Sequence, residues 1–116
     1  MQRLVRHAAL VAALVTLGVA AATPTIAADK PTEIPVTIEN NRFKPDEIKV
    51  KAGQPFVLVV SNKDKKAAEV ENKDLKVEKV VAPGKTVSVR VRALKPGTYV
   101  FVDDFNKSAQ VKIVAE

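Results

Sequence analysis

The sequence predicts an all-β fold, an antiparallel β-sandwich of Greek-key topology, behind an export signal. Apolar residues alternate with polar ones in several short segments, which is the pattern of half-buried strands. Turn-forming residue pairs separate these segments at regular spacing, and no long stretch keeps a helical period. Together these features are typical of a small sandwich domain.

The first segment has the order of parts found in a secretory signal peptide. Arg3 and Arg6 supply positive charge, and residues 8–22 form an uncharged run of small and apolar side chains. Ala27 and Ala28 end the segment with small residues, so cleavage is expected after one or the other. The run is shorter than the ~20 residues that span a bilayer, which argues against a membrane anchor.

We therefore expect residues 1–28 to be a cleaved signal peptide and residues 29–116 to be one periplasmic domain with no membrane span. Removal of the two arginines lowers the formal net charge from +6 to +4. This mild excess is spread along the chain, and no stacking motif accompanies it, so nucleic acid is not an expected partner.

The residue types that are missing restrict the chemistry of the predicted domain. The chain has no cysteine and no tryptophan, and its only histidine and methionine, His7 and Met1, lie in the predicted signal. The domain then has no thiol nucleophile, no imidazole base and no ligands for a type 1 copper site. A metal site would have to be built from oxygen atoms, which favour hard cations.

Strands are expected wherever the alternating or apolar pattern is clear, after a lead-in at residues 29–33. Residues 56–60 are continuously apolar, which predicts a central strand buried on both faces. Residues 67–80 carry a weaker pattern, which fits either two short strands or one strand with a helical turn. In order, the clear segments are 36–39, 48–51, 56–60, 87–91, 99–102 and 111–113.

Turns and loops are expected between these segments. The turn formers are Asn40-Asn41, Ala52-Gly53, Pro83-Gly84 and Pro96-Gly97, and polar loops are expected at 61–66 and 103–107.

Three motifs, in order, resemble those of cupredoxin-like domains. They are F-x-P-x-x-I-x-V-x-x-G at 43–53, V-V-S-N at 59–62 and L-K-P-G-T-Y at 94–99. The resemblance covers residues 36–115 and implies a cupredoxin-like β-sandwich.

The chain also resembles a narrower group within the cupredoxin-like proteins. The segments A-E-V-E-N at 68–72, E-K-V at 78–80 and D-D-F at 103–105 resemble the small periplasmic cupredoxin-like proteins of bacterial iron-uptake systems. That resemblance implies a metal-binding or electron-transfer accessory in ferrous iron uptake. It also implies two partners, an inner-membrane iron permease and a periplasmic iron-binding protein. The chain departs from the group at Asn106, where a histidine is usual, and at Val70, where an aromatic residue is usual.

The candidate metal ligands are carboxylates and one amide. Glu69 and Glu71 lie two residues apart, so in an extended strand both side chains project from one face. The resemblance adds Asp103, Glu78 and the carbonyl oxygen of Asn106, and an iron or manganese ion would suit such a set. The alternative is that these residues are ordinary surface acids paired with nearby lysines.

Two functions from different classes fit the sequence. The first is the periplasmic metal-binding accessory, at most an aid to ferrous iron oxidation. The second is a β-sandwich interaction module that binds no metal. The sequence contains no motif of a hydrolytic enzyme.

Overall fold

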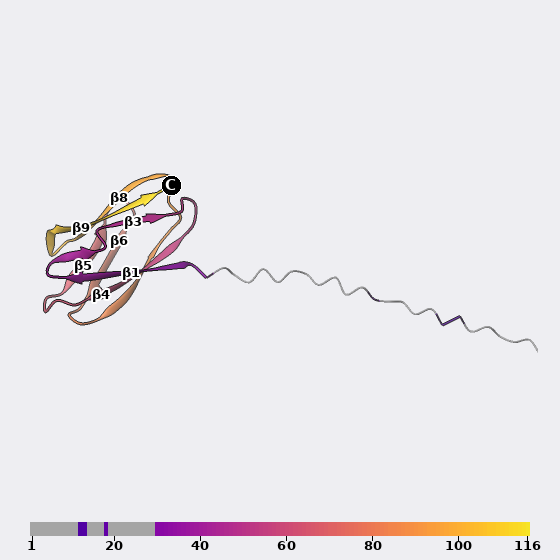
Figure 1. The fold of residues 1–116 in the computed structure, drawn as a ribbon, viewed down its shortest axis with the longest axis horizontal. Helices are drawn as coiled ribbons and strands as arrows, with labels where there is room; N and C mark the ends of the chain where they lie inside the picture. The colour runs from indigo at the N-terminus through magenta and orange to yellow at the C-terminus, as the bar shows by residue number, and fades with distance from the viewer. Residues whose placement is uncertain (1–11, 14–17, 19–29) are drawn as a thin grey trace, which may run out of the picture.

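The computed structural model describes residues 12–13, 18 and 30–116. Apart from three positions, the predicted signal peptide at residues 1–28 lies outside the described residues. The described part forms nine β-strands and no helix (Figure 1). The strands are β1 (Thr32–Glu39), β2 (Arg42–Lys44), β3 (Glu47–Val50), β4 (Phe56–Asn62), β5 (Ala68–Asn72), β6 (Val77–Val81), β7 (Thr86–Val91), β8 (Gly97–Asp103) and β9 (Asn106–Ala115).

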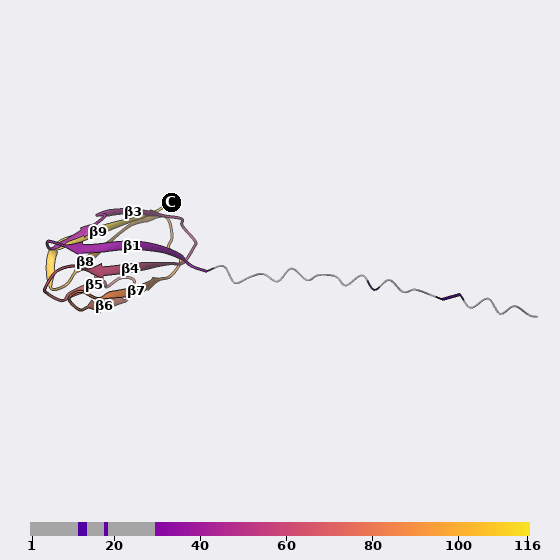
Figure 2. The same ribbon diagram turned by 60° about the horizontal axis from the view of Figure 1, so that its bottom comes forward.

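The strands make two sheets, which confirms the predicted all-β sandwich. One sheet has the order β2-β1-β4-β7 and the other has the order β3-β9-β8-β5-β6. The strands lie side by side along the length of the domain (Figure 2). Both sheets are mixed, because β1 pairs with β4 and β3 pairs with β9 in parallel, while the other pairings are antiparallel.

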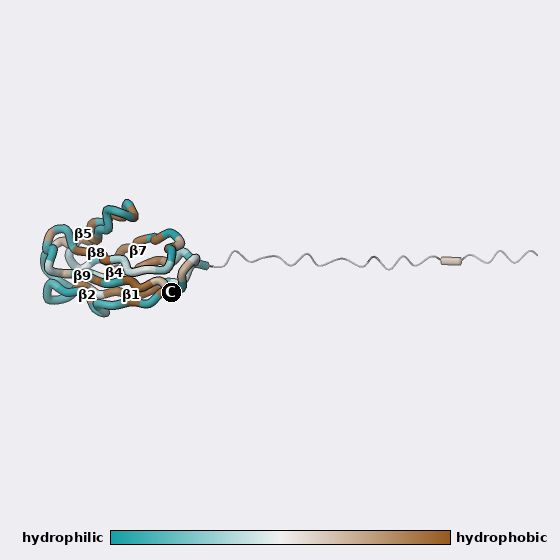
Figure 3. The backbone as a smooth tube through the Cα atoms, turned by 90° about the horizontal axis from the view of Figure 1, so that it is seen from above, coloured by the Kyte–Doolittle hydropathy of each residue, from teal (hydrophilic) through white to brown (hydrophobic). Residues whose placement is uncertain are grey.

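The core lies between the sheets and consists of aliphatic side chains and three phenylalanines, Phe43, Phe56 and Phe101. Phe101, Val60 and Ile113 are fully buried within it. Hydrophobic and hydrophilic segments alternate along the strands of the domain (Figure 3). The prediction that residues 56–60 are buried on both faces was wrong, because Val57 and Val59 are only half-buried on the outer face.

Several predicted boundaries also shift. β1 begins at Thr32, inside the expected lead-in, because its first residues pair with the start of β4. The weak region resolves into the two strands β5 and β6, joined by a tight turn, which settles the alternative left open by the sequence. The turn at Asn40-Asn41 is confirmed: both residues have positive φ, as a two-residue hairpin between β1 and β2 requires.

The parallel pairing of β1 with β4 defines two ends of the domain. Thr32 is in register with Phe56 at one end, and Ile38 is in register with Asn62 at the other. The loop from β4 to β5 lies at the second end, where the Lys63 N–H donates to the Ile38 carbonyl at 2.7 Å.

No helix in the described part of the chain is long and apolar enough to cross a membrane.

Candidate metal centre

Strand β5 places Glu69 and Glu71 on one face of the five-stranded sheet. Residues alternate along the strand, so Ala68 and Val70 point into the core while the two glutamates point away from it. Both glutamates are nevertheless buried, at 8% and 7% exposure, because β5 is flanked by β6 and β8. The prediction that both glutamate side chains project from one face of the strand is therefore confirmed.

The third carboxylate of the group comes from the turn between β8 and β9. Oxygen atoms of Glu69, Glu71 and Asp104 all lie within 4.8 Å of one another. Two oxygens that bind one cation at about 2.0–2.6 Å can be no more than about 5.2 Å apart. The three side chains can thus reach a common ion without rearrangement of the backbone.

Strand β6 brings Glu78 to the edge of this group. Glu78 lies directly opposite Glu71 in the β5–β6 register, and directly opposed like charges destabilise a sheet. Its carboxyl group is also close enough to the Glu69 carboxyl to raise the pKa of that group through a side-chain hydrogen bond. Glu78 itself is exposed, so it flanks the three clustered carboxylates from the solvent side.

The electrostatics of Glu69 reflect this crowding. Burial raises the pKa of the Glu69 carboxyl, and the hydrogen bond to Glu78 raises it further. The negative charges of Glu78, Asp104 and Glu71 act in the same direction, because each disfavours a second negative charge nearby. A cation bound among these groups would reverse that effect.

Two lysines offset part of the negative charge. Lys73 Nζ lies 3.8 Å from Glu71 Oε1, and Lys107 Nζ lies 3.8 Å from Asp104 Oδ1. Both lysine side chains are largely exposed, so these ion pairs are weak. All four residues of the two pairs line an open depression of about 290 Å³.

Asp103 and Asn106 occupy different places from the three clustered carboxylates. Asp103 is 5% exposed, and its Oδ1 accepts hydrogen bonds from the backbone N–H groups of Glu69 at 2.9 Å and Phe105 at 3.0 Å. The Asn106 side chain accepts a 2.8 Å hydrogen bond from the Ser108 hydroxyl. Neither belongs to the group of three, although both lie in or beside the turn that carries Asp104.

Asp104 completes the group of three carboxylates, whereas the sequence predicted its neighbour Asp103. The alternation along β8 could have identified it. Tyr99 and Phe101 mark the inward positions, so Asp103 continues the inward series, and Asp104 follows on the side of Val100 and Val102. Val102 is directly opposite Glu71, which places that side on the glutamate face.

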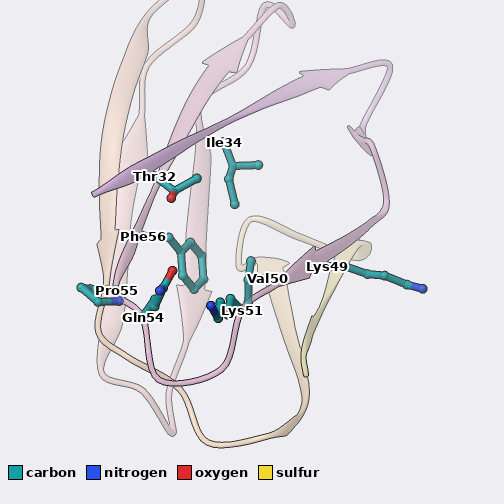
Figure 4. Close-up of a pocket in the computed structure, with 8 residues that line it drawn as sticks. All are labelled: Thr32, Ile34, Lys49, Val50, Lys51, Gln54, Pro55 and Phe56. Carbon is teal, nitrogen blue, oxygen red and sulfur yellow. The ribbon is translucent and has the colours of Figure 1, made fainter. Parts of the chain in front are cut away.

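The apolar pocket of the domain lies at the far end from these carboxylates. It has a volume of about 170 Å³ and opens beside the starts of β1 and β4 (Figure 4). Apolar side chains, two lysines, a threonine and a glutamine surround it, and none of the residues that line it is a carboxylate or a histidine: Thr32, Ile34, Lys49, Val50, Lys51, Gln54, Pro55 and Phe56. The pocket is thus unsuited to a hard cation.

The sequence matches one family model over residues 7–115, that of the cupredoxin-like domain. An uncharacterized protein of Rickettsia prowazekii (strain Madrid E) is 32% identical over 79 residues. That alignment covers 68% of this chain and 63% of the Rickettsia protein, so the chain spans less than two thirds of that relative.

Solved structures with a similar fold include copper proteins. Auracyanin A, a blue copper protein of Chloroflexus aurantiacus, superposes with a TM-score of 0.61 at 17% identity, over 75% of this chain and 100% of auracyanin. Amicyanin of Paracoccus versutus gives 0.58 at 17% identity, over 77% and 87%. The metal-binding domain of the Cu(I)-exporting P-type ATPase CopA of Streptococcus pneumoniae gives 0.64 at 13% identity, over 72% and 84%. At these identities the likeness concerns the fold.

Proposed function

The chain belongs to the cupredoxin-like domain family, and we propose that it is a periplasmic accessory protein that binds iron on carboxylates during ferrous iron uptake. It contains no cysteine, so it has no type 1 copper site. The observation that carries the proposal is the convergence of Glu69, Glu71 and Asp104 within 4.8 Å, with two of the three buried.

The donor set fits a hard cation better than copper. Carboxylate oxygens suit Fe²⁺, Fe³⁺ and Mn²⁺, whereas copper sites of electron-transfer proteins need thiolate and imidazole. The crowding of the carboxylates adds to their attraction for a cation, because two adjacent carboxylates lose their mutual repulsion when an ion of opposite charge lies between them. Glu78 is close enough to Glu69 to join the coordination from the solvent side.

The cargo ion would be held more tightly as Fe³⁺ than as Fe²⁺, because the harder ion gains more from carboxylate oxygens. Such preferential binding lowers the reduction potential of the bound iron and makes loss of its electron easier. We assign binding and hand-over of iron to this chain. By its resemblance to proteins of iron-uptake systems, an inner-membrane iron permease and a periplasmic iron-binding protein are the proposed partners.

Anaerobic calorimetric titration of the purified protein with Fe²⁺ tests the proposal. We expect binding that saturates at a single ion per chain, with a dissociation constant in the micromolar range or weaker, equivalent to about −8 kcal/mol or less favourable. The absence of nitrogen ligands is the reason for expecting weak binding. Heat changes equal to those of buffer alone would contradict the proposal.

The second candidate function is a β-sandwich interaction module without a metal. Two observations favour it: Asn106 stands where relatives of the iron-uptake group usually have histidine, and Lys73 and Lys107 already pair with the site carboxylates. Under this alternative the lysines are the permanent counter-ions of Glu71 and Asp104, and neither Fe²⁺ nor Mn²⁺ binds.

A further inference from the structure

Asp103 is a buried carboxylate that does not belong to the group formed by Glu69, Glu71 and Asp104. It ends β8 on the core side of the sheet and is 5% exposed. None of the ion pairs among residues 30–116 includes it. Burial of a carboxylate without a paired cation is costly, so hydrogen bonds to Asp103 must offset that cost.

The hydrogen bonds of Asp103 join the two segments that carry the proposed ligands. Its Oδ1 accepts from the Glu69 N–H at 2.9 Å, across from β8 to β5. The same oxygen accepts from the Phe105 N–H at 3.0 Å, within the turn that presents Asp104. A third bond closes the arrangement, because the Asp104 N–H donates to the Glu69 carbonyl at 2.8 Å.

The result is a small ring of hydrogen bonds that fixes Glu69 relative to Asp104. Both backbone polar groups of Glu69 are tied to residues 103 and 104, one as a donor and the other as an acceptor. The carboxylates of Glu69 and Asp104 project from this ring toward the same ion position. Both lone pairs of the Asp103 Oδ1 atom are engaged in the ring, so Oδ2 is the oxygen of this side chain that is left to bind a metal, and an amide in its place tests that role.

We infer that Asp103 is the positioning residue of the proposed metal site: its side chain clamps Glu69 and the Asp104 turn so that their carboxylates converge before the ion arrives. This inference rests on the proposed function. Residues that orient metal ligands in this way commonly change metal affinity by about 10–100-fold when they are replaced.

Two substitutions in the full chain separate a clamp from a ligand. Asp103→Asn keeps an Oδ1 acceptor for both N–H groups but removes the charge, so we expect Mn²⁺ affinity within about threefold of wild type. Asp103→Ala removes the acceptor, so we expect at least about a tenfold loss of affinity. Calorimetry gives the affinities, and the electron paramagnetic resonance spectrum of bound Mn²⁺ reports the geometry, which should change only in the alanine variant.

Other outcomes overturn the inference. If Asp103→Asn weakens binding as much as Glu71→Gln does, Asp103 is a ligand. If Asp103→Ala binds Mn²⁺ as wild type does, the side chain serves stability alone. Should the alanine variant fail to fold, Asp103→Ser replaces it, because a shorter hydroxyl cannot reach both N–H groups, and the same loss is expected.

Asp64 provides a matched control. Its carboxylate also accepts two backbone N–H groups, from Asn40 at 2.7 Å and Asn41 at 2.9 Å, in a turn that bears no proposed ligand. Asp64→Ala should lower the melting temperature and leave Mn²⁺ affinity unchanged. An equal loss of affinity in both alanine variants would mean general destabilisation. If wild type binds no Mn²⁺ or Fe²⁺, the proposed function fails together with this inference; if it binds and Asp103→Ala binds equally well, only this inference fails.

Discussion

Lys73 reaches Glu71 from the solvent: the two side chains approach to 3.8 Å, although the side chain of the lysine is 82% exposed and the side chain of the glutamate only 9%. The lysine therefore places a mobile positive charge beside a fixed and buried negative one. In the protein without metal it partly offsets the crowding of the carboxylates, and it competes with any cation that enters.

Removal of this competitor should strengthen metal binding. We expect Lys73→Gln to raise Mn²⁺ affinity about threefold and to change the stability of the metal-free protein by less than about 1 kcal/mol, because exposed ion pairs contribute little. Calorimetric titration at low ionic strength measures the affinity. Lys49→Gln is the control, because Lys49 makes an ion pair of the same 3.8 Å length with Glu116, away from the site. Equal affinities in all three proteins would show that Lys73 does not compete.

The raised pKa of Glu69 predicts a pH dependence of stability. Burial and the neighbouring Glu78 raise this pKa above the ordinary value of 4.5, so the folded protein holds the Glu69 proton more tightly than the unfolded chain does. The resulting stabilisation is full below pH 4.5 and is lost as the pH rises through the folded pKa. In metal-free urea unfolding, wild type should therefore lose stability relative to Glu69→Gln as the pH rises from about 4.5 toward neutrality. Parallel stability curves for the two proteins would contradict the assigned environment of Glu69.

Copper binding should distinguish this chain from the blue copper proteins that share its fold. The intense colour of those sites requires a bond between copper and a thiolate, and the chain has no cysteine. We expect weak Cu²⁺ binding at neutral pH and no intense visible absorption, as measured by spectrophotometric titration. A blue complex of the protein would refute the assignment of its donor atoms.

Export can be tested by mass. We expect the chain recovered from the periplasm to begin at Ala28 or Asp29, as determined by intact-mass spectrometry. A full-length chain in the membrane fraction would refute the predicted signal peptide.

Much of the fold could be predicted because period-two alternation is a local signal. The alternation of Val87, Val89 and Val91 with polar residues placed β7 directly, and Asn40-Asn41 marked the hairpin between β1 and β2. Strand β2 was missed because three residues are too few to show a period. The parallel pairings were missed because partner choice depends on contacts between residues distant in the sequence.

The candidate site was predictable in the same measure. Glu69 and Glu71 share a face because they are two residues apart in one strand, and this spacing can be read from the sequence alone. The choice between Asp103 and Asp104 depended on the phase of β8 at its last residue, where a register irregularity begins. The burial of the two glutamates could not be predicted, because it comes from the strands on either side.

The most direct test of the carboxylate site is the melting temperature of three proteins, measured anaerobically with and without Fe²⁺: wild type, Glu71→Gln and Glu33→Gln. Glu33 is exposed on β1 and serves as the control. At a hundredfold excess of Fe²⁺ over its dissociation constant, we expect stabilisation of wild type and Glu33→Gln by about 2.7 kcal/mol. Glu71→Gln should lose most of this gain, while its metal-free form stays as stable as wild type because one repulsion is relieved. No rise in the wild-type melting temperature, or an equal rise in Glu71→Gln, would contradict the site.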